Sequence, residues 1–152
     1  MIRSRFLAIS AMLFLFASLL TRTPVVAAAP CVDIRIKPTE PPFCLELAAD
    51  HESRRIGLQH RRDLPPRGGM LFVFPETASR VFWMQDTHLE LDIIFLNEKG
   101  RIVCLASRVV PSSIKIGAPA RYVVELAGGT AERLDLWPGD LIVLPANLAG
   151  GR

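Results

Sequence analysis

The sequence predicts a mainly β protein, an antiparallel β-sandwich or barrel-like domain of seven to eight short strands with one or two short helices. Three observations carry this prediction. Residues 32–37 alternate strictly between apolar and polar side chains, as a half-buried strand does. Residues 70–74 form a continuous apolar run of strand length. Clusters of turn-forming residues interrupt the chain at short intervals, which is typical of short connected strands.

The remaining elements follow from the same signals. Two helices are expected: one from an N-cap at Asp50 to about Gln59, and a shorter one near residues 131–136. Residues 65–69 and 97–100 are rich in Pro, Gly and Asn and are expected to be connecting loops. The strands are expected at residues 32–37, 43–48, 70–74, 80–85, 91–96, 101–110, 122–126 and 141–144.

Residues 1–28 have the pattern of a secretory signal peptide: two arginines near the start, then an uncharged apolar run, then small residues. The apolar run, residues 6–20, is shorter than the roughly 18–20 residues that a membrane-spanning helix needs. We therefore expect cleavage after Ala27 or Ala28, and a periplasmic or secreted protein without a transmembrane segment. An uncleaved N-terminal anchor is the alternative.

The charge of the mature chain argues against a nucleic-acid partner. The formal net charge of +3 equals the contribution of Arg3, Arg5 and Arg22, which all leave with the signal peptide. The remaining chain is formally neutral, so the basic isoelectric point indicates no affinity for nucleic acid. Residues 29–144 are long enough for one β-rich domain with its own core, and residues 145–152 are expected to be a frayed tail.

The three cysteines allow one disulfide at most. Cys104 lies within an expected strand, where a small buried hydrophobic residue is the simplest interpretation. Cys31 and Cys44 are then the candidate pair, and export makes a disulfide chemically feasible. A hairpin centred near Glu40 would place Cys44 opposite Ile36 instead, so the pairing stays open.

Several segments follow one another in an order that is specific to one family. They are Arg54 to Arg61 (RRIGLQHR), Gly68 to Phe74 (GGMLFVF), Phe82 to Gly100 (FWMQDTHLELDIIFLNEKG), Tyr122 to Gly129 (YVVELAGG) and Pro138 to Asp140 (PGD). Together they resemble the prokaryotic family catalogued as domain of unknown function 192, over residues 43–144. The resemblance implies a compact β-sandwich-like fold in an exported or envelope-associated protein. It implies no particular activity.

The chain departs from the family pattern at four positions. Gln59 stands where the family usually has Met after Gly-Leu, and Gln85 and Asp86 stand where it usually has Lys-Asn. Glu90 replaces the Pro that usually precedes Leu-Asp.

The densest cluster of chemically useful side chains lies around Trp83. Asp86, His88, Glu90 and Asp92 follow it within a short stretch. The irregular connection at residues 86–90 would bring two carboxylates and an imidazole near one point, which suits acid–base chemistry or weak metal binding. A structural interpretation competes with this one: Asp92 accepts backbone N–H groups in a turn, Trp83 belongs to the core, and His88 lies in a solvated loop. The histidines lack zinc-type spacing, so no metal and no cofactor is expected.

A second cluster is cationic. Arg54 and Arg61 match the family pattern, and guanidinium groups bind carboxylates or phosphates in pairs. The alternative is a solvated helix face, with an arginine paired to Asp92 or Asp140. The turn at Pro138 to Asp140 also lets Asp140 accept local backbone N–H groups.

We expect an exported protein that binds a small polar ligand, such as a sugar or an envelope component, through Trp83, Arg54, Arg61, Asp92 and Asp140. One alternative is a small hydrolase-type enzyme that uses Asp86, His88, Asp92 or Asp140. Another is a structural partner in an envelope complex. The chain has neither a phosphate-binding loop nor a Gly-x-Ser-x-Gly nucleophile elbow, which favours binding over catalysis.

Overall fold

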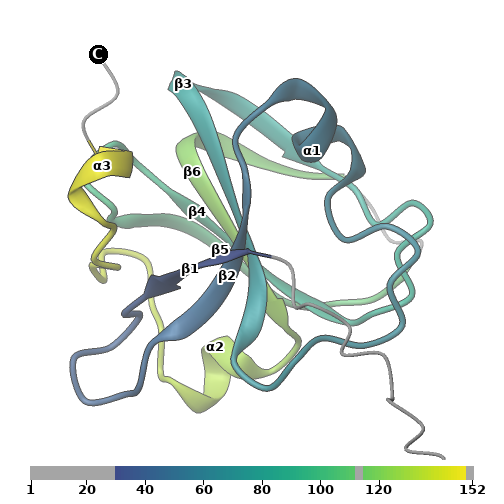
Figure 1. Ribbon diagram of the computed structural model, residues 1–152, viewed down its shortest axis with the longest axis horizontal. Coiled ribbons are helices and arrows are strands. Elements are labelled where there is room, and N and C mark those ends of the chain that lie inside the picture. The colour runs from purple at the N-terminus through teal and green to yellow at the C-terminus, as the bar shows by residue number, and fades with distance from the viewer. Residues whose placement is uncertain (1–29, 112–114, 150–152) are drawn as a thin grey trace, which may run out of the picture.

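The computed structural model describes residues 30–111 and 115–149, which form one twisted six-stranded sheet flanked by short helices (Figure 1). The expected signal peptide, residues 1–28, lies outside this range. The strands are β1 (Cys31–Ile34), β2 (Phe43–Ala48), β3 (Gly68–Phe82), β4 (Leu91–Leu96), β5 (Ile102–Val109) and β6 (Ile116–Ala127). The helices are α1 (His51–Ile56), α2 (Thr130–Arg133) and α3 (Ala146–Ala149).

The sheet has the order β1-β2-β3-β6-β4-β5 and is mixed. The predicted mainly β class with few short helices is confirmed, but the prediction of a purely antiparallel sheet is wrong, because β2 and β3 run parallel. The sheet does not close, since β1 and β5 are its two edges. Parallel neighbours need a long crossover, and residues 49–67, with α1, supply it.

The described residues contain fewer strands than expected, for two reasons. First, the segments expected at 70–74 and 80–85 belong largely to the single long strand β3. Pro75 does not end β3, because it falls where the pairing with β6 shifts between Val73 and Ala78. Second, residues 141–144 form only isolated bridges rather than a strand.

The two faces of the sheet carry separate apolar clusters. One cluster packs against α2 and the segment after it, and includes Leu71, Tyr122 and Leu134; we call this the α2 face. The other packs against the chain that follows α1, and includes Leu58, Phe72 and Phe95; we call this the α1 face. Figure 1 shows α1 and α2 at different ends of the sheet. Successive side chains along a strand point to opposite faces of the sheet, so β4 and β6 each contribute residues to both clusters.

Cys31 and Cys44 form a disulfide between β1 and β2, with their Cα atoms 5.3 Å apart. The register places Cys44 opposite Asp33, so the hairpin is centred earlier than Glu40 and Cys31 lies within diagonal reach. Cys104 is free and half-buried on β5. Within residues 30–111 and 115–149, no helix is both long and apolar enough to cross a membrane.

Part of the expected tail, residues 145–152, lies within the described residues. Residues 146–149 form α3, and the Leu148 carbonyl accepts a 2.8 Å hydrogen bond from the hydroxyl of Tyr122, which is buried in the α2 face. This contact ties the last described turn to the core.

Candidate functional site

An open cavity of about 370 Å³ lies on the α1 face of the sheet. Its walls come from α1 and the residues that follow it, from β3, from two residues of the β3–β4 connection, and from one residue of β6. The residues that matter below are His51, Arg54, Arg80, Trp83, Thr87 and Glu125. The cavity therefore unites parts of the chain that are far apart in sequence.

The local sequence fixes how α1 sits beside the cavity. Asp50 is the N-cap, and its carboxylate accepts backbone hydrogen bonds of 2.9 Å from both Glu52 and Ser53. The Ser53 hydroxyl also donates to this carboxylate and holds the Asp50 pKa below its usual value. Gly57 ends the helix at a φ of +53°, and a Cβ there would meet the Phe72 ring at 3.2 Å. The reversal at Gly57 buries Leu58 against the sheet.

Trp83 forms an exposed wall of the cavity. Its side chain is 48% exposed, whereas the neighbouring Met84 is 1% exposed. The Nζ atom of Lys115 lies 5.8 Å from the centre of the indole ring. Trp83 is therefore not a core residue, and it lines the cavity with a partly exposed aromatic ring.

The guanidinium groups of Arg54 and Arg80 are among those that line the cavity. Arg54 donates from one nitrogen, Nη1, to the backbone carbonyls of Ala49 at 2.5 Å and Val73 at 2.8 Å. Its guanidinium carbon lies 5.2 Å from the ring centre of Phe74, and that of Arg80 lies 4.1 Å from the same ring. Within the described part of the chain, neither arginine forms an ion pair with a carboxylate. Both charges are held in place without being neutralised.

Glu125, like Arg80, is a cavity residue that the sequence analysis did not name as a candidate. It lies on β6, between Met70 of β3 and Ile93 of β4, and its side chain belongs to the apolar α1 face. It is 5% exposed, and no described residue donates a hydrogen bond to its carboxyl group. Burial raises the pKa of Glu125 to about 8, since the charged form loses its hydration. The available signal was an acid inside the otherwise apolar run of residues 122–126.

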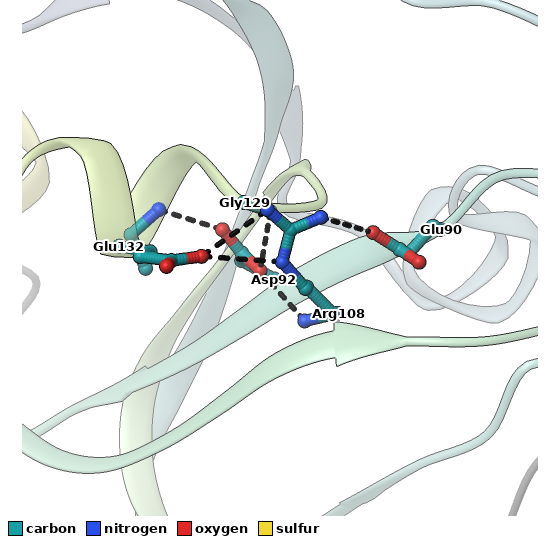
Figure 2. A network of polar contacts seen from close by, with 6 residues as sticks. Glu90, Asp92, Arg108, Gly129 and Glu132 are labelled. Carbon is teal, nitrogen blue, oxygen red and sulfur yellow. Dashed lines mark hydrogen bonds and ion pairs between the residues drawn. The ribbon is translucent and has the colours of Figure 1, made fainter.

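Asp92, a predicted site residue, lies on the other face of the sheet and is fully buried. Its carboxylate accepts three backbone hydrogen bonds: from Arg108 at 2.8 Å, from Gly129 at 3.1 Å and from Ala131 at 2.6 Å (Figure 2). These contacts hold the β5 strand and the start of α2 against β4. The structure thus places Asp92 in the role of a backbone acceptor, away from the cavity.

The side chain of Arg108 extends the same network. Figure 2 shows its guanidinium between Glu90 and Glu132, and it pairs with each at 3.1 Å. These two carboxylates raise the pKa of Arg108, with Glu132 the larger cause. Arg108 and Gly129 both adopt positive φ angles, 51° and 82°. The Asp92 carboxylate satisfies the N–H groups of both residues.

Arg61 and Asp140 are also placed outside the cavity. Arg61 pairs with Glu46 of β2 through two contacts of 2.5 Å, which raise the pKa of its guanidinium. The Asp140 carboxylate accepts the Trp137 backbone N–H at 3.1 Å and pairs with Lys37 at 3.2 Å. The Trp137 hydrogen bond is the main reason that the pKa of Asp140 is lowered.

The other acid–base candidates, Asp86 and His88, lie outside the cavity. Both are exposed. Asp86 has a φ of 54°, and its carbonyl accepts the His60 N–H at 2.7 Å. Among the residues described, no three His, Cys, Asp or Glu side chains are placed to hold a metal ion.

The four departures from the family pattern fall in different environments. Gln59 lines the cavity, and its amide donates to the Arg55 carbonyl at 3.4 Å. Gln85 and Asp86 are exposed, and Glu90 belongs to the Arg108 network. Only the Gln59 departure therefore touches the cavity.

Comparison with known proteins agrees with the resemblance found in the sequence. The structure is similar to that of a protein from Sinorhizobium meliloti described as a candidate transcription regulator. That similarity has a TM-score of 0.68 and 35% identity, and it covers 76% of this chain and 96% of the other. It is also similar to a protein of unknown function from Novosphingobium aromaticivorans, with a TM-score of 0.71 and 31% identity, over 79% of this chain and 89% of that one. No curated protein matches. The model of the family DUF192, described as "Uncharacterized ACR", matches residues 33–144, and the chain belongs to this family.

Proposed function

We propose that this protein is an exported binding protein, which holds a small ligand with a ring and polar groups in the cavity beside α1. One observation carries the proposal: an exposed indole, Trp83, and a buried carboxyl group, Glu125, which has no partner among the described residues, line the same cavity. Both are unfavourable for the unliganded protein, and both are relieved by a bound molecule.

The size and lining of the cavity suit such a ligand. Its volume of about 370 Å³ falls in the usual range of small-molecule sites, about 300–1,000 Å³. Phe72, Phe74 and Phe82 supply apolar surface, as in typical ligand pockets that combine aromatic walls with a few polar groups. A ring stacked on Trp83 would contribute roughly 1 kcal/mol beyond its buried area.

The surroundings of the other acids favour binding over hydrolysis. Asp92 and Asp140 are engaged by backbone N–H donors, and Asp86 and His88 lie outside the cavity. These four residues therefore do not bring together a nucleophile and a base, as the hydrolase alternative requires.

A nucleic-acid role, suggested for the Sinorhizobium relative by its description, is not the one we propose here. The chain without its first 28 residues is formally neutral. Arg55, Arg61 and Arg67 are each paired with a glutamate, so these cations form no free basic face.

The test is a screen of single-ring polar compounds by ligand-detected NMR against the exported protein. Trp83→Ala should abolish the signal of any bound compound, since the ring loses its stacking partner. Trp137→Ala is the matched control, because Trp137 is 65% exposed and does not line the cavity. Binding that survives Trp83→Ala, or that both variants lose equally, would remove the proposal.

The export part of the proposal rests on the signal-peptide pattern and has its own test. N-terminal sequencing of the protein from a periplasmic fraction should begin at Ala28 or Ala29. An intact Met1 in the membrane pellet would contradict export with cleavage.

A further inference from the structure

Glu125 is a buried acid that faces a cavity and has no partner among the described residues. Its neighbours across the sheet are Met70 and Ile93, and Phe72 and Phe82 flank the cavity beside it. Buried carboxyl groups are otherwise paired or hydrogen-bonded in proteins, because an unsatisfied one is costly. A partner from outside the chain would satisfy it.

The charges around the cavity narrow the chemistry of that partner. His51, Arg54 and Arg55 face it from α1, and Arg80 faces it from β3. Arg55 is neutralised by Glu52 at 2.6 Å, whereas Arg54 and Arg80 have no carboxylate partner among the described residues. A molecule that carried only a positive charge would be repelled by these two guanidiniums.

We propose that Glu125 determines ligand specificity: the cavity takes a molecule whose amine group binds Glu125 and whose anionic group lies toward Arg54 and Arg80. This rests on the proposed function and specifies its ligand class. The ring or apolar body of the molecule lies between the two charges, against Trp83. The ammonium group of the ligand then pairs with Glu125, and its anionic group pairs with Arg54 and Arg80. None of these three side chains has an oppositely charged partner among the described residues.

Binding of an ammonium group couples to a proton. At neutral pH the free protein holds a proton on Glu125, because burial raises its pKa to about 8. The bound ammonium pairs with the ionised carboxylate, so the Glu125 proton passes to solvent as the complex forms. Affinity should therefore rise roughly tenfold for each pH unit from about 6 to about 8 and then level off.

Three matched probes test the assignment: para-aminomethylbenzoate, para-hydroxymethylbenzoate and para-toluate. All three carry the same ring and carboxylate and differ only in the group that would reach Glu125. Dissociation constants are measured by calorimetry on the exported protein between pH 6 and pH 8. We expect the amine to bind at least about tenfold more tightly than the other two at pH 8.

Two variants separate the groups that titrate. Glu125→Gln should remove both the preference for the amine and its pH dependence. His51→Gln removes the histidine that lines the cavity, and loss of the pH dependence in this variant rather than in Glu125→Gln would contradict the assignment. Circular dichroism checks that each variant is folded. If Glu125→Gln does not fold, the ranking and the pH slope in the unaltered protein decide.

The outcomes distinguish the two proposals. Equal affinities for the three probes, with binding still lost in Trp83→Ala, would overturn the assignment of Glu125 and leave the binding function standing. No Trp83-dependent binding of any probe at about 1 mM, where even weak single-ring ligands bind, would overturn both.

Discussion

Asp92 and Glu125 are two carboxyl groups buried in neighbouring strands of one sheet, and they differ in what surrounds them. Asp92 on β4 is opposite Leu126, and Glu125 on β6 is opposite Ile93, one register position away. Asp92 points to the α2 face and accepts three backbone N–H groups, whereas Glu125 points to the α1 face and accepts none from the described residues. The two carboxyl groups are similarly buried, but only Asp92 is satisfied by hydrogen bonds from the described residues.

The difference teaches how to separate a structural acid from a binding acid. The donors of Asp92 come from backbone segments, those of Arg108, Gly129 and Ala131, that would be unsatisfied without it, so Asp92 stabilises the fold. Glu125 stabilises nothing that is described, and its burial costs free energy once it is ionised. A buried acid that lowers the stability of the free protein is the better candidate for contact with a ligand.

The largest effect is expected for Asp92→Ala. This change leaves three backbone N–H groups, one buried and two partly buried, without their acceptor, at about 1–2 kcal/mol each, so the free energy of unfolding should fall by about 3–6 kcal/mol. Urea denaturation measures the loss. Asp33→Ala, at an exposed position on β1, is the control and should cost less than about 0.5 kcal/mol. A loss below about 1 kcal/mol for Asp92→Ala would show that the three hydrogen bonds do not stabilise the segments around Arg108, Gly129 and Ala131.

The next effect is a pH dependence that belongs to Glu125. Its pKa is about 8 in the folded protein and near 4.5 in the unfolded chain, so the folded state binds more protons between these values. Stability therefore falls as pH rises from about 4.5 to about 8, by 5 kcal/mol at most and about 2–4 kcal/mol if water enters the open cavity. Glu125→Gln removes this slope and is more stable than the unaltered protein at pH 8, by chemical denaturation. Parallel pH profiles for the two proteins would contradict the account.

A smaller effect is expected for Asp140→Ala. The carboxylate accepts the Trp137 N–H and pairs with Lys37, but it is partly exposed, so the loss should be about 1 kcal/mol. Because the pKa of Asp140 is lowered in the folded protein, its contribution is lost as pH falls through the acidic range. An unchanged denaturation midpoint for Asp140→Ala would show that the turn holds without it.

The smallest stability effect is expected for Trp83→Ala. With nearly half of its surface exposed, Trp83 should contribute less than about 1 kcal/mol, against roughly 3–5 kcal/mol for a core tryptophan. In a Trp137→Phe background, iodide should quench the fluorescence of the remaining indole. A fully protected indole would place Trp83 in the core and exclude stacking.

The sequence predicted the strands better than their pairing. Alternating and apolar runs located β1, β2, β4, β5 and β6, because those patterns depend only on neighbouring residues. The parallel pairing of β2 with β3 depends on the path of residues 49–67, which no local pattern specifies. Pro75 suggested a break, yet it falls in a shift of register where its missing N–H is tolerated.

Two of the five candidate binding residues lie at the cavity. Trp83 and Arg54 do line one cavity, and the family motifs drew attention to both. Arg61, Asp92 and Asp140 lie elsewhere, because their distances from Trp83 depend on the tertiary fold. Glu125 was missed since a charged residue on a strand is usually solvent-facing, and only the packing on both faces of β6 shows that it is buried.

The most direct test of the contrast between the two acids is a carbon-13 NMR titration of the Glu125 side-chain carboxyl in the free protein. Glu125→Gln identifies the resonance. The account predicts a titration midpoint near pH 8, because burial disfavours the ionised form of this carboxyl group. A midpoint near 4.5 would show that the group is already solvated or paired, and would contradict the assignment of the α1-face cavity as a site built around Glu125.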